Sequence, residues 1–353
     1  MTDEVLYGCK VFYAPLSNCP ICDKNASKLL FKIRENLMQK DVFNIVQCQQ
    51  CKLIYVNPQP DDISIYYSPE KYHGFFIPDS HRKIIETETN VFIKVKNILK
   101  KITLSIHYGY FQNTKKQGLN KFLKFITFLL KYRFNWIFPK YRKNGKILDV
   151  GCAGGDYLKK LQELGWDVWG VDISAESIIY AKQVLGLTNV YTGEFETMEL
   201  PKNYFDVVTF NGVFEHMQNP TKCLTKCHDV LKPGGEIILT LPSVDGWDCK
   251  LFGKFWCWWE APRHLFFYSR TTIKNLLNKN SFEVKSIEYS PEANSFLYSL
   301  TGFLSNILRK RANKVLYAVI VKNRILYYLL LPVGLFFSKL KMTSTMTVIA
   351  VKK

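Results

Sequence analysis

Two pairs of cysteines near the start of the chain have a spacing that indicates metal chemistry. Cys19 and Cys22 form one CxxC pair, and Cys48 and Cys51 form a second. If each pair lies on a tight turn between short strands, each turn points two thiolates at one centre. The spacing therefore predicts a tetrahedral zinc site with a structural role, because four thiolates leave no open position for a substrate. Buried cysteines with no shared ligand are the alternative interpretation.

A glycine-rich turn, Gly151–Gly155, is the second feature with chemical potential. It follows a strand expected over 146–150 and precedes an expected helix, so a ligand can approach the backbone beside a helix N-terminus. The next expected strand ends at Asp172, where a carboxylate can accept hydrogen bonds from ribose hydroxyls. These features predict a nucleotide-type cofactor but do not separate NAD from S-adenosylmethionine.

Five motifs that occur in one order along the central third of the chain distinguish between these two cofactors. They are Leu148-Asp-Val-Gly-Cys-Ala-Gly-Gly155, Gly170-Val-Asp-Ile-Ser174, Gly193-Glu-Phe-Glu196, Phe205-Asp-Val-Val-Thr-Phe-Asn-Gly-Val-Phe-Glu-His216 and Leu231-Lys-Pro-Gly-Gly-Glu-Ile-Ile-Leu239. Together they resemble the motifs of class I S-adenosylmethionine-dependent methyltransferases. The resemblance implies an α/β fold with a Rossmann-like, seven-stranded sheet whose last strand is antiparallel. The turn reads GxAxG rather than GxGxxG, which argues against a nicotinamide cofactor.

The resemblance also assigns roles to individual residues. It implies that Asp149 reaches towards the methionine end of the cofactor, Asp172 holds the ribose, and the segment from Asn211 lies under the sulfonium. Ala153 departs from the family, which most often has glycine there. The expected cofactor-binding residues are Asp149, Gly151, Cys152, Ala153, Gly155, Asp172, Ile173, Glu194, Phe195 and Asn211.

Two histidines are candidates for the base that a hydroxyl or carbon-acid acceptor would need. His216 follows Glu215 just beyond the fourth strand of the sheet, and His264 lies in a later Trp-rich region. The alternative for His216 is a structural role in orienting its loop. In similar quinone-ring O-methyltransferases a carboxylate one turn earlier helps to bind magnesium. Here that position is Gly212, which argues against a metal at the catalytic site.

The stretch 247–259 is rich in tryptophan and is followed by Glu260 and Arg263. It resembles the substrate loop of a subfamily found among bacterial cell-surface sugar, natural-product and lipid methyltransferases, in which N-terminal zinc ribbons recur. Aromatic rings can stack on a sugar, and Arg263 can meet a phosphate. Glu260 and Arg263 are therefore the expected substrate contacts, with an aromatic cluster that only packs as core as the alternative.

The composition and the apolar periodicity along the chain predict five regions. They are a zinc-ribbon-like module over 1–75, a basic amphipathic helical lid or linker over 76–143, the S-adenosylmethionine-binding core over 144–295, an apolar and basic helical insertion over 296–340, and the final strand of the core sheet over 341–353. The helical regions are expected to pack on the core, to cover the substrate or to rest on a membrane surface.

The formal net charge of +18 is unevenly distributed. Positions 1–90, 91–148, 149–295 and 296–353 carry −1, +14, −5 and +10. All of the excess therefore lies in two apolar, acid-free segments beside the expected core, so a phosphorylated or membrane-borne acceptor explains the charge better than nucleic acid does.

The expected function is methyl transfer from S-adenosylmethionine to a small-molecule acceptor, a sugar or a nucleotide- or lipid-linked glycan precursor. An RNA methyltransferase and a non-catalytic binding module on the same fold are the alternatives. The start of the chain shows no signal-peptide pattern, so we expect a cytoplasmic protein, peripheral at the inner face of the membrane. The sequence indicates no oligomeric state.

Overall fold

The computed structural model describes residues 13–14, 18–35, 41–61, 63, 66, 91–111, 127, 138–291, 293–308, 316–321 and 324–353. Its largest unit is a seven-stranded sheet in the order β12-β13-β10-β9-β6-β7-β8. The strands of this sheet are β6 (Lys146–Val150), β7 (Asp167–Asp172), β8 (Val190–Thr192), β9 (Phe205–Asn211), β10 (Leu231–Pro242), β12 (Phe282–Tyr289) and β13 (Thr345–Lys352). β13 runs antiparallel to both of its neighbours, and the pairs among β6 to β10 are parallel. The predicted fold class is confirmed.

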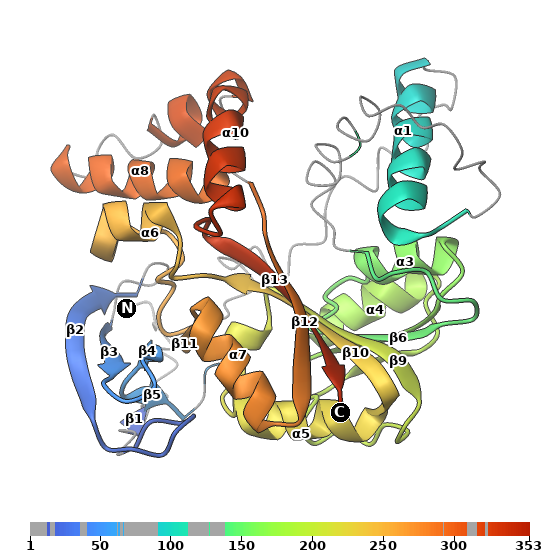
Figure 1. Ribbon diagram of the computed structural model, residues 1–353, viewed down its shortest axis with the longest axis horizontal. Coiled ribbons are helices and arrows are strands. Elements are labelled where there is room, and N and C mark those ends of the chain that lie inside the picture. Colours follow the sequence, from blue (N-terminus) through green and yellow to red (C-terminus); the bar gives the residue numbers. More distant parts are fainter. Residues whose placement is uncertain are drawn as a thin grey trace, which may run out of the picture.

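Helices alternate with the parallel strands and cover both faces of the sheet (Figure 1). The helices of the core are α3 (Asp156–Glu163), α4 (Ala175–Gln183), the 3-10 turn η4 (Phe214–His216), α5 (Pro220–Val230) and α7 (Arg270–Lys279). Hydroxyl and amide side chains begin three of them: Ser174, Asn219 and Ser269 each accept a hydrogen bond from a backbone N–H of the first turn. Such caps satisfy N–H groups that have no partner within the helix.

Strand β10 begins earlier than its apolar pattern predicts. The sequence places the strand from Glu236, whereas the paired segment starts at Leu231, with a register shift between these two residues. The intervening Lys-Pro-Gly-Gly segment bulges, and Gly234 takes a positive φ of 71°. Glycine adopts that conformation without the steric cost of a side chain.

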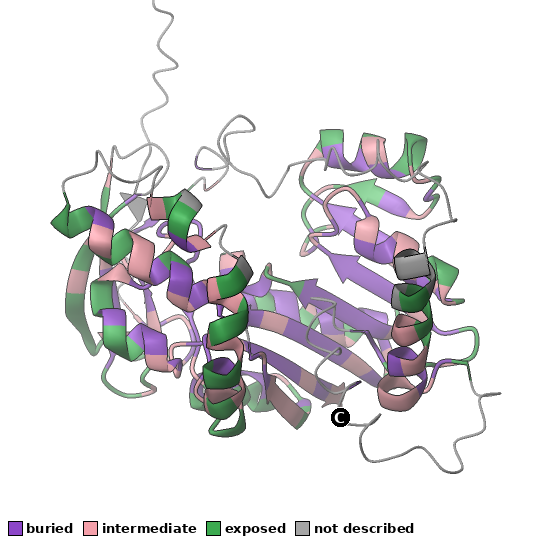
Figure 2. Ribbon diagram, turned by 90° about the horizontal axis from the view of Figure 1, so that it is seen from above, coloured by how far each residue is buried: buried purple, intermediate pink, exposed green. Residues whose placement is uncertain are grey.

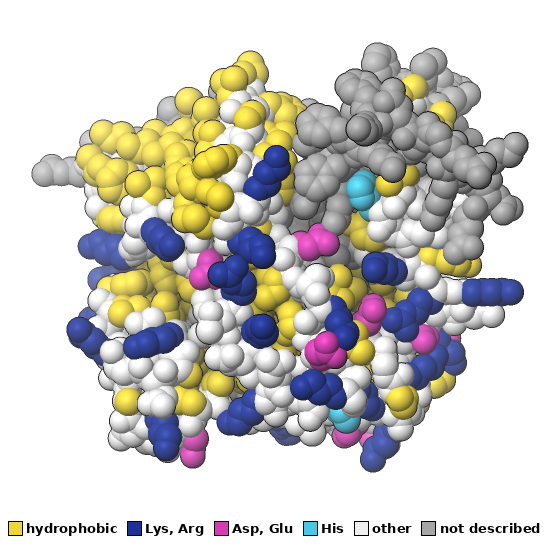
Figure 3. All heavy atoms as spheres, viewed as in Figure 1, with side chains coloured by type: hydrophobic (Ala, Val, Ile, Leu, Met, Phe, Trp, Pro, Cys, Tyr) yellow, Lys and Arg dark blue, Asp and Glu magenta, His cyan; other side chains and the backbone are white. Residues whose placement is uncertain are grey.

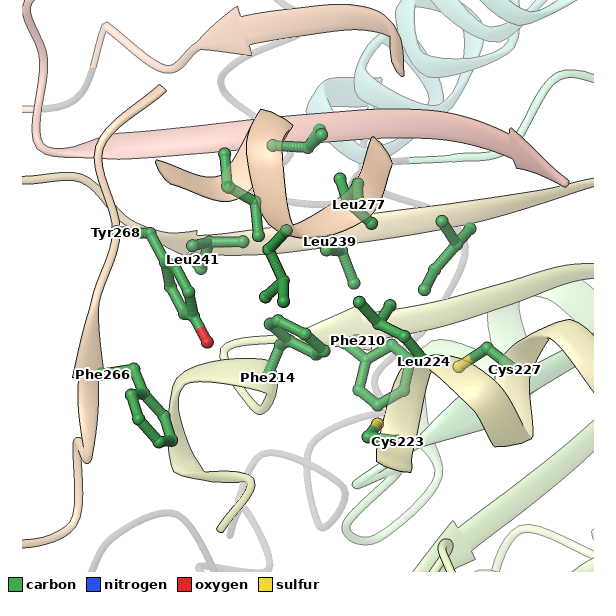
Figure 4. Close-up of a cluster of buried hydrophobic side chains, with 14 of the residues drawn as sticks. Phe210, Phe214, Cys223, Leu224, Cys227, Leu239, Leu241, Phe266, Tyr268 and Leu277 are labelled. Atoms are coloured by element: carbon green, nitrogen blue, oxygen red, sulfur yellow. The ribbon is translucent and has the colours of Figure 1, made fainter. Parts of the chain in front are cut away.

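The core on the α5 and α7 face is built from aromatic and aliphatic side chains of β9, β10 and these helices. Figure 4 shows Phe210, Leu239 and Leu241 pointing from the strands towards Leu224 and Leu277 of the helices. These side chains are all buried. The fully buried runs of β9 and β10 are typical of a parallel sheet covered on both faces.

A second sheet joins the N-terminal module to the core. Its strands are β2 (Ser27–Arg34), β3 (Val42–Cys48), β4 (Ile54–Val56) and β11 (Phe266–Phe267), in the order β11-β4-β3-β2. A two-stranded sheet pairs β1 (Tyr13–Ala14) with β5 (Gln59–Pro60). Since β11 comes from the Trp-rich region far along the chain, the module and the core share one hydrogen-bonded sheet (Figure 1).

Further helices lie around the open edges of the sheet. They are α1 (Val91–Tyr108), α6 (Trp247–Phe252), the 3-10 turn η5 (Gly253–Phe255), α8 (Asn294–Ile307), the π-helical η6 (Tyr317–Val321) and α10 (Arg324–Lys339). In Figure 1, α6, α8 and α10 form one group and α1 lies across from it. Residues 76–90, 112–126 and 128–137 of the predicted lid lie outside the described residues.

Helix α8 exposes large apolar side chains. It buries Leu297 together with Ser295, Ser299 and Ser305, and it exposes Tyr298 and Phe303. Figure 2 shows exposed and half-buried residues along this group of helices, in contrast to the buried strands of the sheet. No helix within the described ranges has the length and apolar character needed to cross a bilayer.

Candidate functional site

The glycine-rich turn leaves β6 at the carboxyl edge of the sheet. Gly151 has a φ of 70°, and a Cβ atom there would lie 2.5 Å from Cγ2 of Val213. Gly155 has a φ of 82° and precedes α3. A Cβ atom there would lie 2.5 Å from Cδ1 of Leu187. Both positions need glycine for the turn and for the close packing of their neighbours.

Ala153 also takes a positive φ, of 45°. An alanine in this region costs about 1–2 kcal/mol relative to its preferred conformations. Its backbone N–H donates a 2.8 Å hydrogen bond to Oδ2 of Asp172, which stabilises the strained residue. Cys152, beside it, is buried and contacts β7 at Gly170.

Asp149 joins two strands at the topological switch point of the sheet. β6 and β9 are neighbours, and the chain continues outwards in opposite directions from them, which is where open α/β sheets bind ligands. Oδ1 of Asp149 accepts hydrogen bonds from Oγ1 of Thr209 (2.6 Å) and Nδ2 of Asn211 (3.1 Å). Burial nevertheless raises the pKa of Asp149 to about 7. A bound cation would favour the ionised form of this carboxyl group.

Asp172, at the end of β7, holds the neighbouring backbone segments together. Its two carboxylate oxygens accept hydrogen bonds from the N–H groups of Ala153 and Ser174, each at 2.8 Å. Burial raises the pKa of this carboxyl group as well. Each oxygen keeps a second lone pair, so the group can accept hydrogen bonds from diol hydroxyls while it orders the turn.

The remaining expected cofactor residues lie on both sides of this edge. Ile173 follows Asp172 and is 54% exposed, an apolar surface beside the site. Glu194 is exposed, whereas the ring of Phe195 is buried and packs edge-on against Phe210. Phe195 therefore contributes to the core, and Glu194 is the exposed residue of the two.

His216 and His264 come together with Glu215 in one cluster, in which Glu215 and His264 are buried and His216 is half-buried. Their ring centroids lie 4.7 Å apart, and one ligand atom from each of the three residues lies within 4.8 Å of the others. Burial lowers the pKa of His216 to about 3 and that of His264 to about 4, and it raises the pKa of Glu215 to about 8. Both rings are therefore neutral at neutral pH.

Arg263 has a different position from the one expected. Its side chain is fully buried, and Nη1 lies 2.8 Å from Oε1 of Glu35 in the N-terminal module, while Nε lies 3.7 Å from Oε2 of Glu260. The guanidinium charge is thus balanced by protein carboxylates. Direct contact with a substrate phosphate, expected from the sequence, is inconsistent with this burial, and Arg263 instead links the module to the core.

The tryptophans of the stretch 247–259 divide between packing in the core and exposure to a cavity. Trp256 and Trp259 are buried in a core cluster with Phe267, and Trp247 stacks on Phe296 and Phe337. Trp258 stacks on His264 with ring centroids 6.2 Å apart and lines the cavity. The core interpretation therefore holds for most of the stretch, with Trp258 as the exception.

The cavity has a volume of about 780 Å³ and lies against β10, β12 and β13 on the side of α1. Three buried polar atoms on its lining have no hydrogen-bond partner among the described residues: Oε2 of Glu215, Nε1 of Trp258 and Oγ1 of Thr240. An unsatisfied buried polar group costs about 1–3 kcal/mol.

The four cysteines of the two CxxC pairs gather at one point. Sγ of Cys19 lies 3.5 Å from Sγ of Cys51, and Sγ of Cys22 lies 3.5 Å from Sγ of Cys48. All four are free thiols. Tetrahedral zinc with bonds of about 2.3 Å separates its sulfur ligands by about 3.8 Å. The donor set therefore fits zinc.

The two CxxC turns have the same local conformation. The residue after each pair, Asp23 and Lys52, takes a positive φ. In each turn a backbone N–H returns to the carbonyl of the first cysteine, from Asp23 to Cys19 (2.8 Å) and from Lys52 to Cys48 (3.0 Å). The repeated geometry presents the two thiols of each pair in the same direction.

Three residues of the site were not predicted from the sequence. Thr209, two residues before Asn211 on β9, shares its face, so the alternation of a strand could have indicated it. Glu215 was noted only as the neighbour of His216. Glu35, the partner of Arg263, has no local pattern that marks it.

Comparison with known proteins agrees with this geometry. Residues 121–287 match a family model described as a methyltransferase domain. The chain is 34% identical over 115 residues to a ubiquinone biosynthesis O-methyltransferase of Pseudomonas paraeruginosa, covering 31% of this chain and 49% of that protein. A protein of the same name from Colwellia psychrerythraea is 36% identical over 108 residues, which cover 28% of this chain and 44% of that protein. The match spans about half the length of these relatives.

Solved structures also resemble parts of the chain. A SAM-dependent methyltransferase from Archaeoglobus fulgidus has 22% identity and a TM-score of 0.42, covering 66% of this chain and all of that one. A methyltransferase of the same description from Aquifex aeolicus has 22% identity and a TM-score of 0.35, and the match covers 42% of this chain and 78% of that one.

The sheet order, the carboxylates at its switch point and the family match define one class of domain. The chain contains a class I S-adenosylmethionine-dependent methyltransferase domain. The domain carries a four-cysteine module whose strand β4 pairs with β11, just after the Trp-rich region.

Proposed function

We propose that this protein transfers a methyl group from S-adenosylmethionine to a hydroxyl group of a sugar-containing acceptor. The observation that carries the proposal is the cavity against β10, β12 and β13, lined by Glu215, Trp258 and Thr240 with unsatisfied polar atoms. The relatives are named as O-methyltransferases, which favours an oxygen acceptor.

The charges on the cavity lining favour a neutral sugar there. Lys140 and Lys285 line the cavity together with Glu215, Glu236 and Glu288. Basic side chains therefore do not outnumber acidic side chains on the cavity lining. An anionic phosphate would gain little from this lining. Any phosphate or lipid of the acceptor would therefore lie outside the cavity.

The residues at the edge of the sheet would bind and orient the two reactants. Asp172 and Asp149 provide acceptors for the ribose and for the cationic end of the cofactor, and Asn211 holds Asp149 in place. S-adenosylmethionine supplies an electrophilic methyl group, so the chain mainly has to align the acceptor oxygen and exclude water. The acceptor proton passes to Glu215, which lines the cavity and accepts a proton in its ionised form.

The four-cysteine module would bind zinc as a structural ion. Its donor set fits that metal, and the bound ion would stabilise a small sheet that has a limited core of its own. Through β4 and β11 the module supports the loop that carries Trp258. This role is structural, because the thiolates take up all positions of a tetrahedral ion.

The apolar helices would rest on an anionic membrane that bears the acceptor. α8 and α10 expose Tyr298, Phe303, Ile325, Leu329 and Phe336, and Figure 3 shows hydrophobic side chains gathered over this group of helices with basic residues beside them. Positions 296–353 hold ten basic and no acidic residues. Exposed apolar surface flanked by positive charge is typical of binding to anionic lipid.

The experiment that tests the proposed activity is calorimetry with S-adenosylmethionine, followed by methyl-transfer assays on a sugar pool and an RNA pool. We expect binding of the cofactor, loss of binding in Asp172→Ala, and transfer to the sugar pool only. Binding unaffected by Asp172→Ala would contradict the assigned cofactor site. Transfer to RNA, with binding that weakens steeply with salt, would overturn the acceptor class.

A further inference from the structure

Helix α1 is packed against the core at one end and exposed at the other. Leu104, in its C-terminal half, is buried against side chains of the core, and Tyr108 at its end packs beside the same cluster. Val95 and Ile98, in its N-terminal half, are 49% and 56% exposed. Helix α1 therefore projects from the sheet with aliphatic side chains exposed towards its N-terminal end (Figure 1).

Helix α10 is arranged in the same way. Near its C-terminal end, Oγ of Ser338 donates a 2.6 Å hydrogen bond to the carbonyl of Tyr289, the last residue of β12. In its N-terminal half, Ile325 and Leu329 are 72% and 68% exposed. Figure 1 shows both helices on the same side of the sheet, with their C-terminal ends nearer the strands. The exposed segments, 95–98 of α1 and 325–329 of α10, are called the outer ends below.

Positive charge accompanies both outer ends. Positions 91–108 hold four lysines and no acidic residue, and positions 296–353 hold ten basic and no acidic residues. Exposed aliphatic side chains with basic residues nearby are typical of helices that bind the surface of an anionic bilayer. A second copy of the chain is a less suitable partner, because it would bring positive charge against positive charge. The charge therefore favours an anionic membrane as the partner of both helices.

The cavity lies between the packed ends of the two helices. His107 and Tyr108, at the end of α1, line it on one side. Ser290 and Thr345, which also line it, belong to the chain segments just before α8 and just after α10. A bilayer in contact with both outer ends would therefore face the part of the molecule that contains the cavity.

We propose that α1 is a second membrane-binding element, and that its outer end and that of α10 contact one anionic bilayer on either side of the cavity. The proposal rests on the membrane surface of α8 and α10 given under the proposed function. Once one contact has formed, the other becomes intramolecular, so the two together bind more tightly than either alone. Two contacts also restrict the orientation of the protein, so the headgroup of a lipid-linked acceptor would approach the cavity from the bilayer.

The first test is co-sedimentation of the full chain with vesicles of phosphatidylcholine and phosphatidylglycerol. Val95→Glu with Ile98→Glu should lower the partition coefficient by at least about tenfold, because each change removes an apolar contact and adds a negative charge. Ile179→Glu with Val184→Glu is the matched control, since these two aliphatic side chains are equally exposed at α4. The control should bind like the wild type.

The second test asks whether both outer ends touch the same bilayer. A fluorescent thiol label is placed on Ile98→Cys, Leu329→Cys or Ile179→Cys, and the vesicles contain lipids with brominated acyl chains that quench it. We expect quenching at positions 98 and 329 and none at position 179. Wild-type protein treated with the same reagent measures the background from the native thiols.

The outcomes separate this proposal from the proposed function. Wild-type affinity in the α1 variant, or quenching at position 329 without quenching at position 98, would overturn the role of α1 alone. The absence of vesicle binding by the wild type would overturn both membrane assignments. Calorimetry with S-adenosylmethionine checks that the α1 variant is folded, and if it is not, the quenching at position 98 decides. Methyl transfer to a soluble sugar pool is measured without vesicles, so its failure rejects the proposed activity alone.

Discussion

At the scale of single residues, the site depends on carboxylates that are held at the edge of the sheet by short contacts. Asp172 accepts two backbone hydrogen bonds and orders the glycine-rich turn, while Asp149 accepts from Thr209 and Asn211 across the switch point. Both groups are buried. A polar group that is buried and oriented before the ligand arrives costs no reorganisation when the ligand binds.

The titration of Asp149 leads to a prediction about cofactor binding. Its pKa is raised to about 7 by burial, so the ionised fraction rises from about one tenth at pH 6 to about nine tenths at pH 8. Because the cofactor is cationic, its affinity should rise with pH across this range, by up to about ninefold if only the carboxylate binds. Calorimetry at a series of pH values measures this change.

The controls for this prediction are two isosteric variants. Asp149→Asn should bind more weakly, with an affinity that does not change between pH 6 and 7.5. Asp167→Asn, at the opposite end of β7, should keep the wild-type dependence. A flat profile in the wild type would contradict the assigned role of Asp149.

At the scale of elements, the N-terminal module and the segment 263–267 that follows the Trp-rich region form one unit. β11 pairs with β4, and the N–H of Val56 donates to the carbonyl of Leu265 at 3.0 Å. The buried pair of Arg263 and Glu35 adds a charged contact between the same two segments. The position of His264 therefore depends on a module that begins more than 200 residues earlier in the sequence.

Breaking the buried ion pair should destabilise the protein strongly. Arg263→Met leaves the carboxylate of Glu35 buried without its partner, so we expect a loss of about 3–5 kcal/mol in the free energy of unfolding. The double variant Arg263→Met and Glu35→Leu removes both charges and should lose much less than the sum of the single changes. Urea unfolding measures all three. Glu283→Gln, which removes an exposed ion pair with Lys285, should leave stability unchanged.

If the four cysteines hold zinc as proposed, removing the ion with a chelator should affect the module and the Trp-rich region but leave the cofactor site unchanged. The thiolates lose the ion that joins the two CxxC turns, so the sheet of β2, β3, β4 and β11 should loosen. We expect a change in near-ultraviolet circular dichroism from the tryptophans of the loop, while S-adenosylmethionine still binds. Cys48→Ser should behave in the same way, and Cys223→Ala, a buried thiol of α5, should not. Loss of cofactor binding on chelation would show that the two regions are not separable.

At the scale of the whole molecule, charge and exposed apolar surface coincide. The net charge of +18 comes from two acid-free segments, and one of them includes the exposed helices α8 and α10. Ile325 and Leu329 are 72% and 68% exposed. Water-exposed side chains of this kind are costly on a free surface, and a bilayer would remove them from water.

The membrane surface is tested by co-sedimentation with vesicles. Wild-type protein should bind vesicles that contain anionic lipid, less at high salt, and Leu329→Glu with Phe336→Glu should reduce the bound fraction by at least about tenfold, since each change removes an apolar contact and adds a negative charge. Ile179→Glu, on the exposed face of α4, is the matched control. Equal binding of all variants, or none by the wild type, would contradict a membrane role for α8 and α10.

The sequence alone determined the class of the fold and much of the cofactor edge. Residues 146–150 and 205–210 predict buried strands, and the turn after the first is rich in glycine. These features depend on neighbouring residues, because the periods of strands and helices and the conformations of turns are local properties. The seven-stranded sheet that the structure shows was implied by the resemblance of the ordered motifs to class I methyltransferases. The gathering of the four cysteines also follows from local turns.

Only the tertiary structure decided which distant side chains meet. Arg263 pairs with Glu35 across 228 residues, and His264 joins Glu215 and His216 because β11 adds to the sheet of the N-terminal module. No local period encodes such contacts, since they arise when separate elements pack against each other. For the same reason, burial, and with it the pKa of each group in the cluster, became known only once the chain was folded.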